Sequence, residues 1–372
     1  MPPQNPTIVT NDTLKEGSSG PTWVNRKWIL VRRPTGIFHL DDVKLVEEEI
    51  TCCEHDEIIV KANVLSCDAF IRTMCDEEAY HGSISIGSTL PAIGYGTVVA
   101  AGPKAKFKVG SMVSGMIGAQ MYVKDKSSAF FPYFKFPFMK LSDGLGLMGL
   151  TTGLTAYVGV HYVLRRPSRS QTCVITAAAG AVGSVAAQLA KHTGARVIGV
   201  AGGAKKCKYL VEDLNLDGAI DYKSLDQTFE EQLDHLCPNG IDFIYDNVGG
   251  TIFDSLLNKI NPNGRVIICG AISQYSGNIN GKGTVYGPSN YLKLAERGAV
   301  MKGFAVTQYF SKIPFAIINM LWLYLRGYVK MTEHVEVGIA SFPKALQNLF
   351  TGGHIGKTLV EVNLDSKKEK SC

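Results

Sequence analysis

A run of small residues at 177–183, Ala-Ala-Ala-Gly-Ala-Val-Gly, limits the fold of this chain more than any other stretch. It follows a short β-branched run at 172–176 and precedes an alanine-rich amphipathic pattern at 184–191. A strand, a tight turn and a helix in this order form the first unit of a dinucleotide-binding sheet, in which the turn and the helix N-terminus receive the pyrophosphate. The segment therefore predicts a nucleotide site.

The spacing of the small residues supports this prediction. Ala178, Gly180 and Gly183 occupy the three small-residue positions of the pattern G-x-G-x-x-G, with alanine at the first. Such a turn needs backbone without bulky side chains where a phosphate approaches and where the helix packs on the strand. Turns of this composition also serve plain helix–strand packing, but the strand–turn–helix context favours nucleotide binding.

Strands and helices alternate on both sides of this turn. The expected strands are 172–176, 196–200, 218–220, 242–245 and 264–269, and the expected helices are 184–191, 205–214 and 253–259. This alternation predicts an α/β fold with a doubly wound parallel sheet. From Arg26 to about Ser142 the pattern is instead β-rich, and a last strand-like run at 357–362 is expected to rejoin that region.

Charge and hydropathy exclude several classes of function. A formal net charge of +5 over 372 residues gives no case for nucleic acid or a membrane surface, which need clustered basic residues. The apolar run 313–325 is shorter than the about 20 residues of a bilayer span, so we expect a buried helix. Nine cysteines without a Cys-x-x-Cys pair, and no signal-peptide pattern, predict a cytoplasmic protein with free thiols.

The residues after the second expected strand bear on the choice of cofactor. An NAD site usually has an acidic residue about 20 residues beyond the turn, bonded to the ribose 2′-hydroxyl. Here Gly202 and Gly203 follow the strand, and Lys205, Lys206 and Lys208 come next. Lysines attract a 2′-phosphate, although a basic helix start is also common on a solvated surface. The pattern favours NADPH.

Several motifs together resemble one known family. The turn, at 176–184, is accompanied by Asp-Asn-Val-Gly-Gly at 246–250, Ile-Cys-Gly-Ala-Ile-Ser-Gln-Tyr at 268–275 and Gly-Lys-Thr-Leu-Val at 356–360. Over about 26–362 the chain resembles the zinc-independent medium-chain dehydrogenases/reductases, in their leukotriene hydroxydehydrogenase/prostaglandin reductase (alkenal/one oxidoreductase) branch.

The resemblance implies a domain plan and a cofactor. It implies a flexible N-terminal extension at 1–25, a GroES-like β-barrel substrate domain at 26–146 completed by 315–372, and a Rossmann NADP-binding domain at 147–314. NADPH would be the hydride donor, and a homodimer is the family expectation.

By motif position, the resemblance also implies a set of cofactor residues. Those for the phosphates and the adenosine half are Gly180, Ala181, Val182, Gly183, Lys206 and Tyr222, and Asn247 is a further cofactor contact. Those for the nicotinamide half are Cys269, Gly270, Ala271, Ile272, Ser273 and Tyr275, with Phe304, Ala305 and Val306 nearby. Where the family often has asparagine this chain has His354, so a contact from His354 stays open, and Lys205 could share the role of Lys206.

The residues do not predict a metal site. Related zinc dehydrogenases have a Gly-His-Glu triplet where this chain has Gly94-Tyr95-Gly96, and Cys67 is out of register with their ligand cysteine. No run of four closely spaced cysteines occurs, and the adjacent Cys52 and Cys53 would point to opposite faces of a strand. Because a zinc site needs three or four convergent ligands, we expect no zinc site in this chain.

A hydride donor without a Lewis acid suits an activated carbon–carbon double bond. In an α,β-unsaturated ketone or aldehyde, such as a 15-oxo-prostaglandin or a lipid-derived enone, hydride adds to the β carbon and hydrogen bonds stabilise the resulting enolate. Tyr275 is the candidate catalytic donor, although it could equally only position the ribose. A quinone reductase of the same superfamily and a non-catalytic NADPH-binding structural relative stay open as alternatives.

The walls of a substrate pocket are harder to predict. The aromatic run 130–138 would either line an apolar pocket or form a core or interface strand. Tyr80 and Tyr122 are further pocket candidates.

Overall fold

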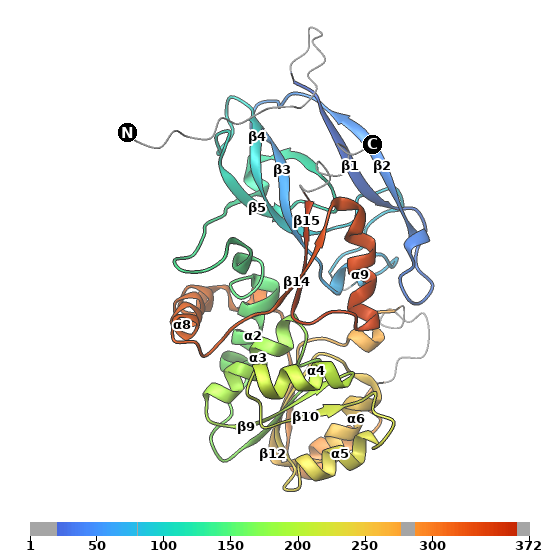
Figure 1. Ribbon diagram of the computed structural model, residues 1–372, viewed down its shortest axis with the longest axis vertical. Coiled ribbons are helices and arrows are strands. Elements are labelled where there is room, and N and C mark those ends of the chain that lie inside the picture. The colour runs from blue at the N-terminus through green and yellow to red at the C-terminus, as the bar shows by residue number, and fades with distance from the viewer. Residues whose placement is uncertain (1–20, 80, 277–286, 363–372) are drawn as a thin grey trace.

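Figure 1 shows a computed structural model of the protein, which describes residues 21–79, 81–276 and 287–362. Two sheets of different topology lie one above the other, and the long connection between them passes through α2 (Thr155–Val158), with wider helical turns at Leu150–Leu154 and Gly159–Val163. The expected α/β fold is confirmed.

The sheet in the lower half of Figure 1 is parallel throughout, as expected. Its strands are β8 (Thr172–Ile175), β9 (Arg196–Ala201), β10 (Gly218–Asp221), β11 (Ile241–Asp246), β12 (Ile260–Ile268) and β13 (Val300–Gly303), in the order β10-β9-β8-β11-β12-β13. The chain starts in the middle with β8, runs outward to β10, and returns to β11 beside β8. The carboxyl ends of β8 and β11 therefore form the topological switch point, where open parallel sheets bind ligands.

Helices connect these strands. They are α3 (Ala181–His192), α4 (Ala204–Lys208), α5 (Phe229–Leu236), α6 (Gly250–Asn258) and α7 (Leu292–Arg297). The helix after the small-residue turn begins at Ala181, earlier than the expected 184, because the small residues of the turn already adopt the first helical turn. Helix α4 continues in a wider turn at Tyr209–Asp213, which fills most of the helix expected at 205–214.

The upper sheet is mixed and belongs to the GroES-like part. Its strands are β3 (Glu57–Ser66), β4 (Ile93–Ala101), β5 (Met112–Met116), β6 (Tyr122–Lys126), β7 (Phe131–Pro132), β14 (Glu333–Val337) and β15 (Lys357–Glu361). A separate hairpin of β1 (Trp23–Leu30) and β2 (Val43–Ile50), together with α1 (Phe70–Met74) and α9 (Phe342–Thr351), completes this part. The last strand, β15, pairs antiparallel with β3, so the C-terminal strand does rejoin the first region.

We propose that the N-terminal extension, expected at 1–25, ends before Trp23. Strand β1 begins at Trp23, and Asn25 is fully buried, with its amide donating to Glu48 and Gln120 at 3.0 Å each. The start of this strand was not predicted, because asparagine and its polar neighbours are not typical of a buried strand. An asparagine can be buried in a core when its hydrogen bonds are made. Residues 1–20 lie outside the described part of the chain.

The expectation of a buried helix at 313–325 is wrong in part. Helix α8 (Ile313–Leu325) forms over the expected residues, but only Ala316, Met320 and Leu323 are buried. They pack in the same cluster as α2 and α3, beside the parallel sheet. We therefore propose that the chain returns to the upper sheet after α8, between 326 and 332, rather than at 315.

Candidate cofactor site

The predicted cofactor residues come together at one edge of the parallel sheet. Each of them follows the carboxyl end of a strand: 180–183 follow β8, Lys206 follows β9, Tyr222 follows β10, Asn247 follows β11, 269–275 follow β12, and 304–306 follow β13. Carboxyl ends of parallel strands share one edge, so sequence segments far apart in the chain face one crevice. This shared edge is the candidate site.

The turn at the switch point has the shape that a phosphate cradle needs. Ala177 is left-handed, with φ +47°, a conformation that costs a non-glycine residue about 1–2 kcal/mol. The carbonyl of Ala177 then accepts from the Gly180 N–H at 2.9 Å. A Cβ on Gly183 would lie 2.2 Å from that carbonyl oxygen, so only glycine fits there. The first N–H groups of α3 have no intrahelical acceptor and are available to an anion.

A buried hydrogen-bond network fixes the two loops of the switch point. The Thr176 hydroxyl donates to Asp246 Oδ1 (2.7 Å), and the Asn247 amide donates to the Thr176 carbonyl (2.8 Å). Asp246 also accepts from the N–H groups of Val248 (3.1 Å) and Gly249 (2.9 Å). Burial raises the pKa of Asp246, while these donors favour its ionised form. The network holds the loop after β11 against the turn after β8.

The C-terminal segment fastens the same turn from the other side. The Gly356 N–H donates to the Ala179 carbonyl at 2.8 Å. Gly356 has φ +76°, and a Cβ there would lie 1.9 Å from the Thr332 carbonyl oxygen. The Gln188 amide, on α3, donates to the Lys330 carbonyl at 2.8 Å. The turn is therefore held between the two parts of the molecule.

Two lysines, which we call the lysine pair, meet beside the adenosine end of the edge. A Cβ on Gly352 would lie 3.5 Å from Nζ of Lys206 and 3.8 Å from Nζ of Lys223. Burial, and then the charge of Lys223, lower the pKa of Lys206. Within the described residues neither ammonium forms an ion pair with a carboxylate. Lys205 points to solvent and is not part of this pair.

His354 and Tyr222 lie around the lysine pair. Burial, and then the charge of Lys206, lower the pKa of His354 to about 4, so the imidazole is neutral near pH 7. Its Nδ1–H donates to the Asn348 carbonyl at 3.2 Å. The half-exposed Tyr222 ring covers Gly202, where a Cβ would lie 2.7 Å from the ring, and Nζ of Lys223 is 5.9 Å from the ring centroid. The group offers positive charge and a flat aromatic surface at one place.

The nicotinamide end is built differently, from a loop that bonds to its neighbours. The Ile272 N–H donates to the Asn247 carbonyl (3.0 Å), and the Ser273 hydroxyl donates to the Val248 carbonyl (2.5 Å). The Tyr275 hydroxyl accepts from the Ala271 N–H at 3.3 Å. A Cβ on Gly270 would lie 2.9 Å from this hydroxyl oxygen, so a side chain there would force the Tyr275 phenol to shift. Tyr275 thus already organises the loop that the resemblance assigns to the ribose.

The remaining predicted residues at this end are apolar or neutral. Burial raises the pKa of the Cys269 thiol to about 12, so Cys269 is not a thiolate nucleophile. Phe304 and Val306 pack on the core next to the sheet, and Phe304 contacts Tyr309 edge-on with ring centroids 6.4 Å apart. This end carries no charged side chain among the predicted residues.

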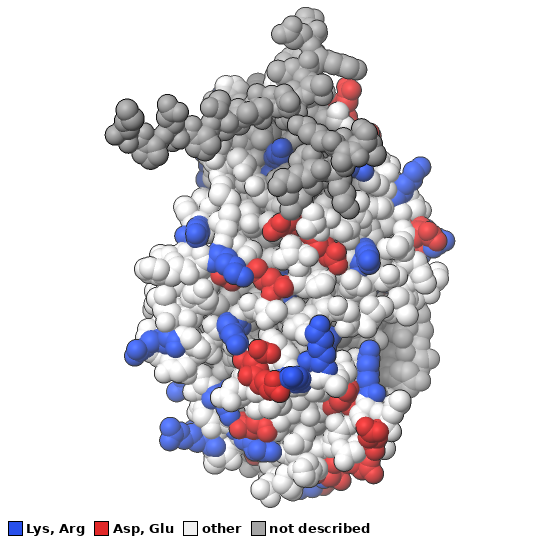
Figure 2. All heavy atoms as spheres, in the orientation of Figure 1, with Lys and Arg blue, Asp and Glu red and all other residues white. Residues whose placement is uncertain are grey.

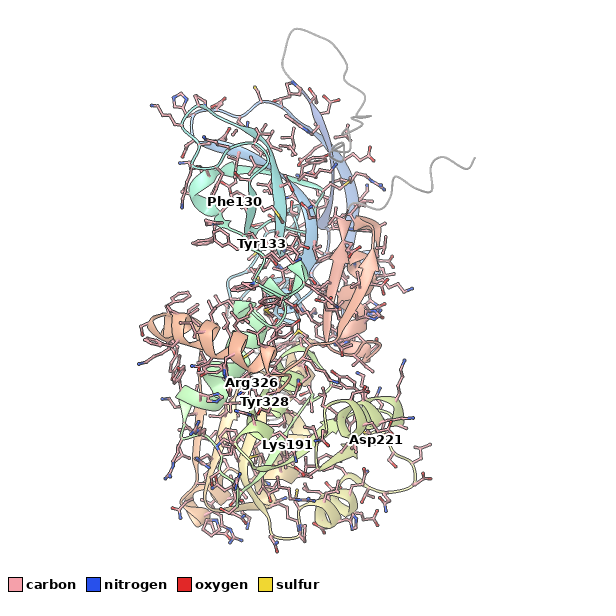
Figure 3. The ribbon with its side chains drawn as sticks, turned by 60° about the vertical axis from the view of Figure 1, so that its left-hand side comes forward. Phe130, Tyr133, Lys191, Asp221, Arg326 and Tyr328 are labelled. Carbon is pink, nitrogen blue, oxygen red and sulfur yellow. The ribbon has the colours of Figure 1, made fainter. Side chains whose placement is uncertain are left out.

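The aromatic run 130–138 does not act as a unit. Figure 3 labels Phe130 and Tyr133, which both belong to the upper part of the molecule. Phe130 is buried in the core there, whereas Tyr133 stacks on Tyr95 with ring centroids 4.4 Å apart. Phe138 is exposed beside α8. Tyr122 is a buried core residue, and Tyr80 lies outside the described residues.

A cavity of about 230 Å³ lies on the upper sheet, away from the turn, and is lined by Val64, Tyr95, Leu141, Ser142, Glu333, Val335, Leu359 and Glu361. It contains none of the predicted site residues. In the described part of the chain, no group of three or more His, Cys, Asp or Glu side chains is arranged to hold a metal ion. No helix there is long and apolar enough to cross a membrane.

Three features of the site were not predicted from the sequence. The first is the position of Lys223 in the lysine pair. Lys223 directly follows Tyr222, and a basic residue next to the predicted adenosine-side tyrosine was the signal that could have indicated it. The Thr176–Asp246 bond joins residues 70 positions apart, and no local pattern marks it. The bond from Gly356 to Ala179 depends on how the last strand returns, which no spacing in the sequence specifies.

Known proteins share both parts of this arrangement. Residues 181–312 match a family model described as zinc-binding dehydrogenase, and residues 26–132 match one described as N-terminal domain of oxidoreductase. The chain is 31% identical to an NADPH-dependent curcumin reductase of Escherichia coli, over 91% of this chain and 97% of that protein. It is 34% identical to a 2-alkenal reductase (NADP(+)-dependent) of Nicotiana tabacum, over 83% of this chain and 88% of that protein.

A solved structure is also similar over most of its length. The crystal structure of CurA from Vibrio vulnificus matches with a TM-score of 0.83 and 31% identity, covering 91% of this chain and 99% of CurA. CurA has also been solved in complex with NADPH, and that structure matches equally well, with a TM-score of 0.83.

Proposed function

Because the chain belongs to the medium-chain dehydrogenase/reductase superfamily, we propose that it is an NADPH-dependent, zinc-independent reductase of the carbon–carbon double bond of α,β-unsaturated ketones and aldehydes. The observation that carries the proposal is the lysine pair beside the switch-point turn. Two ammonium groups that have no carboxylate partner among the described residues suit a 2′-phosphate and would gain little from the hydroxyl of NADH. Relatives named as NADP-dependent curcumin and alkenal reductases support the same assignment.

The residues at the edge fit NADPH. The turn at 180–183 leaves space and N–H donors for the pyrophosphate, and Lys206, Lys223 and Tyr222 would hold the 2′-phosphate and adenosine. The loop 269–275 would hold the nicotinamide ribose, with 304–306 beside it. When bound, NADPH supplies a hydride.

The role of the chain's own residues is to position the substrate and to stabilise charge on its oxygen. As the double bond is reduced, the substrate carbonyl gains enolate character, and a hydrogen-bond donor near that oxygen lowers the barrier. Tyr275 is the candidate donor. Its hydroxyl oxygen accepts from the Ala271 N–H, and this contact fixes where the phenol lies. Water would supply the final proton.

A substrate panel tests the proposed reaction class. We expect NADPH consumption with alkenals, small enones and 15-oxo-prostaglandins, and lower rates with quinones. Faster turnover of quinones would favour a quinone reductase, and NADPH binding without turnover of any member would favour a structural role. Metal analysis of the active protein should give well below one zinc per chain, with activity unchanged by a chelator.

A homodimer is part of the proposal. Strand β13 is one of the two edge strands of the parallel sheet, and all four of its residues are exposed, including Val300 and Met301. Edge strands of this kind pair readily with another strand. We expect a second copy to pair here, which light scattering behind a sizing column would show as twice the monomer mass.

A further inference from the structure

One side of helix α8 is apolar and uncovered. Its four large exposed side chains, which we call the α8 face, are Phe315, Ile318, Trp322 and Leu325, with exposed fractions of 63%, 66%, 47% and 52%. Their spacings of three and four residues place them on one side of the helix. Figures 1 and 3, seen from two directions, both place α8 at the outer edge of the molecule. Trp322 contacts the His192 ring edge-on, with ring centroids 6.0 Å apart, whereas Phe315, Ile318 and Leu325 are not among the described side chains that pack on the core cluster beside α8.

Further aromatic residues extend the α8 face at both ends. Phe310 precedes the helix and is 58% exposed, and Phe138 is 84% exposed beside it, where its carbonyl accepts from the Tyr324 hydroxyl at 3.2 Å. After the helix, the Tyr328 ring lies 5.8 Å from the Trp322 ring, centroid to centroid. Contiguous exposed apolar surface of this kind marks an interaction site.

The charged side chains in the sequence immediately before, within and after α8 have one sign. The stretch 298–332 contains Lys302, Lys312, Arg326 and Lys330 and no acidic residue, although the whole chain has 33 acidic residues. The Arg326 guanidinium lies 5.7 Å above the Trp322 ring centroid, so a charged group borders the apolar surface directly. In Figure 2 the left-hand edge, where α8 lies, is white with basic residues at its border, while acidic residues gather nearer the centre of the view.

We propose that the α8 face is a docking surface for an anionic lipid bilayer, on which the helix lies in the plane of the interface. Phenylalanine, isoleucine and leucine side chains would enter the acyl boundary, tryptophan and tyrosine rings would lie at headgroup level, and the lysine and arginine side chains would contact anionic headgroups. The net charge of the whole chain did not predict this surface, because acidic residues elsewhere mask the local excess.

Charge also decides between a bilayer and a second copy of the chain. Two α8 faces pressed together would bring Lys312 and Arg326 of each copy toward like charges, which is unfavourable at an interface. An anionic surface instead complements both residues. The inference is independent of the proposed reaction, which is measured with soluble enones in the absence of lipid.

Vesicle co-sedimentation of the full chain tests the proposal. We expect binding to phosphatidylcholine vesicles that contain about 30% phosphatidylserine, at least about 10-fold weaker binding to pure phosphatidylcholine, and weakening by salt. Ile318→Glu should reduce binding by at least about 10-fold, because it places a charge in the apolar layer. Leu225→Glu is the matched control, since Leu225 is fully exposed but lies on the loop after β10, and it should bind like wild type.

Two further readouts keep the test decisive. Trp322 fluorescence should shift to the blue on vesicle binding in a Trp23→Phe, Trp28→Phe background, and the Ile318→Glu variant should keep the thermal midpoint and the NADPH affinity of wild type. Three outcomes would each overturn the proposal: no vesicle binding by wild type, equal binding by Ile318→Glu and wild type, or a dimer that Ile318→Glu dissociates.

Discussion

The two ends of the cofactor edge are built on different principles. At the adenosine end, Lys206 and Lys223 bring two positive charges together, and no carboxylate of the described part of the chain neutralises them. At the nicotinamide end, Tyr275 and its loop are held by neutral hydrogen bonds to neighbouring backbone. The adenosine end has a surplus of positive charge that an anionic ligand would neutralise. The polar groups of the nicotinamide end already have hydrogen-bond partners within the protein. Cofactor choice is therefore easier to infer here than the catalytic residue.

The switch-point turn lies between the two ends, and its disruption should have the largest effect. Gly183→Ala places a Cβ 2.2 Å from the Ala177 carbonyl oxygen, and overpacking of this kind should lower the free energy of unfolding by about 3 kcal/mol. Gly180→Ala is the control, because its Cβ would lie 3.2 Å from the same oxygen. Denaturant titrations should show the large loss only for Gly183→Ala, while NADPH binding should weaken in both. Equal stability of the two variants would contradict the packing argument.

Removal of the Tyr275 hydroxyl tests the nicotinamide end. If the hydroxyl stabilises the enolate, Tyr275→Phe should lower kcat about 100-fold at unchanged NADPH affinity, as for loss of one oxyanion donor. If it only organises the loop through Ala271, the loss should be smaller and should appear partly in the affinity for NADPH. Steady-state kinetics together with a cofactor titration separate the two roles. Wild-type values for both quantities would exclude Tyr275 from the site.

Neutralising the lysine pair tests the adenosine end. Lys206→Ala should cost about 1–3 kcal/mol of NADPH binding, the range for hydrogen bonds to charged groups, and should leave NADH binding nearly unchanged. Lys223→Ala should act in the same direction. Lys205→Ala, one position along the same helix but facing solvent, serves as the control and should bind NADPH like wild type. An equal loss for NADPH and NADH in fluorescence titrations would remove the basis for NADPH preference.

The smallest effect concerns His354, whose pKa is lowered to about 4 from an ordinary value of 6.5. Below pH 6.5 the unfolded chain binds a proton at His354 that the folded chain does not bind. The free energy of unfolding is therefore highest above pH 6.5 and decreases as the pH falls toward 4. Between about pH 7 and about pH 4.5, wild type should lose about 1–2 kcal/mol more than His354→Asn. Parallel loss in the two proteins, measured by denaturation at both pH values, would show that His354 titrates normally.

The sequence predicted the parts of the fold that local patterns encode. The alternation of β-branched runs and amphipathic segments predicted the parallel sheet, and the turn at 177–183 predicted the switch point. The contacts of Lys223 and Gly356 were not predicted, because they depend on which strands lie side by side, and this is a property of the folded chain. The burial of α8 was overestimated, because hydropathy alone does not say which side of an apolar helix the core covers.

The structure of the product distinguishes reduction of the double bond from reduction of the carbonyl. The protein should be incubated with NADPH and an α,β-unsaturated ketone, and the product identified by mass spectrometry and NMR. We expect a saturated ketone, in which the carbonyl is retained and the former β carbon carries the hydrogen delivered as hydride by NADPH. An allylic alcohol with its double bond intact would contradict it.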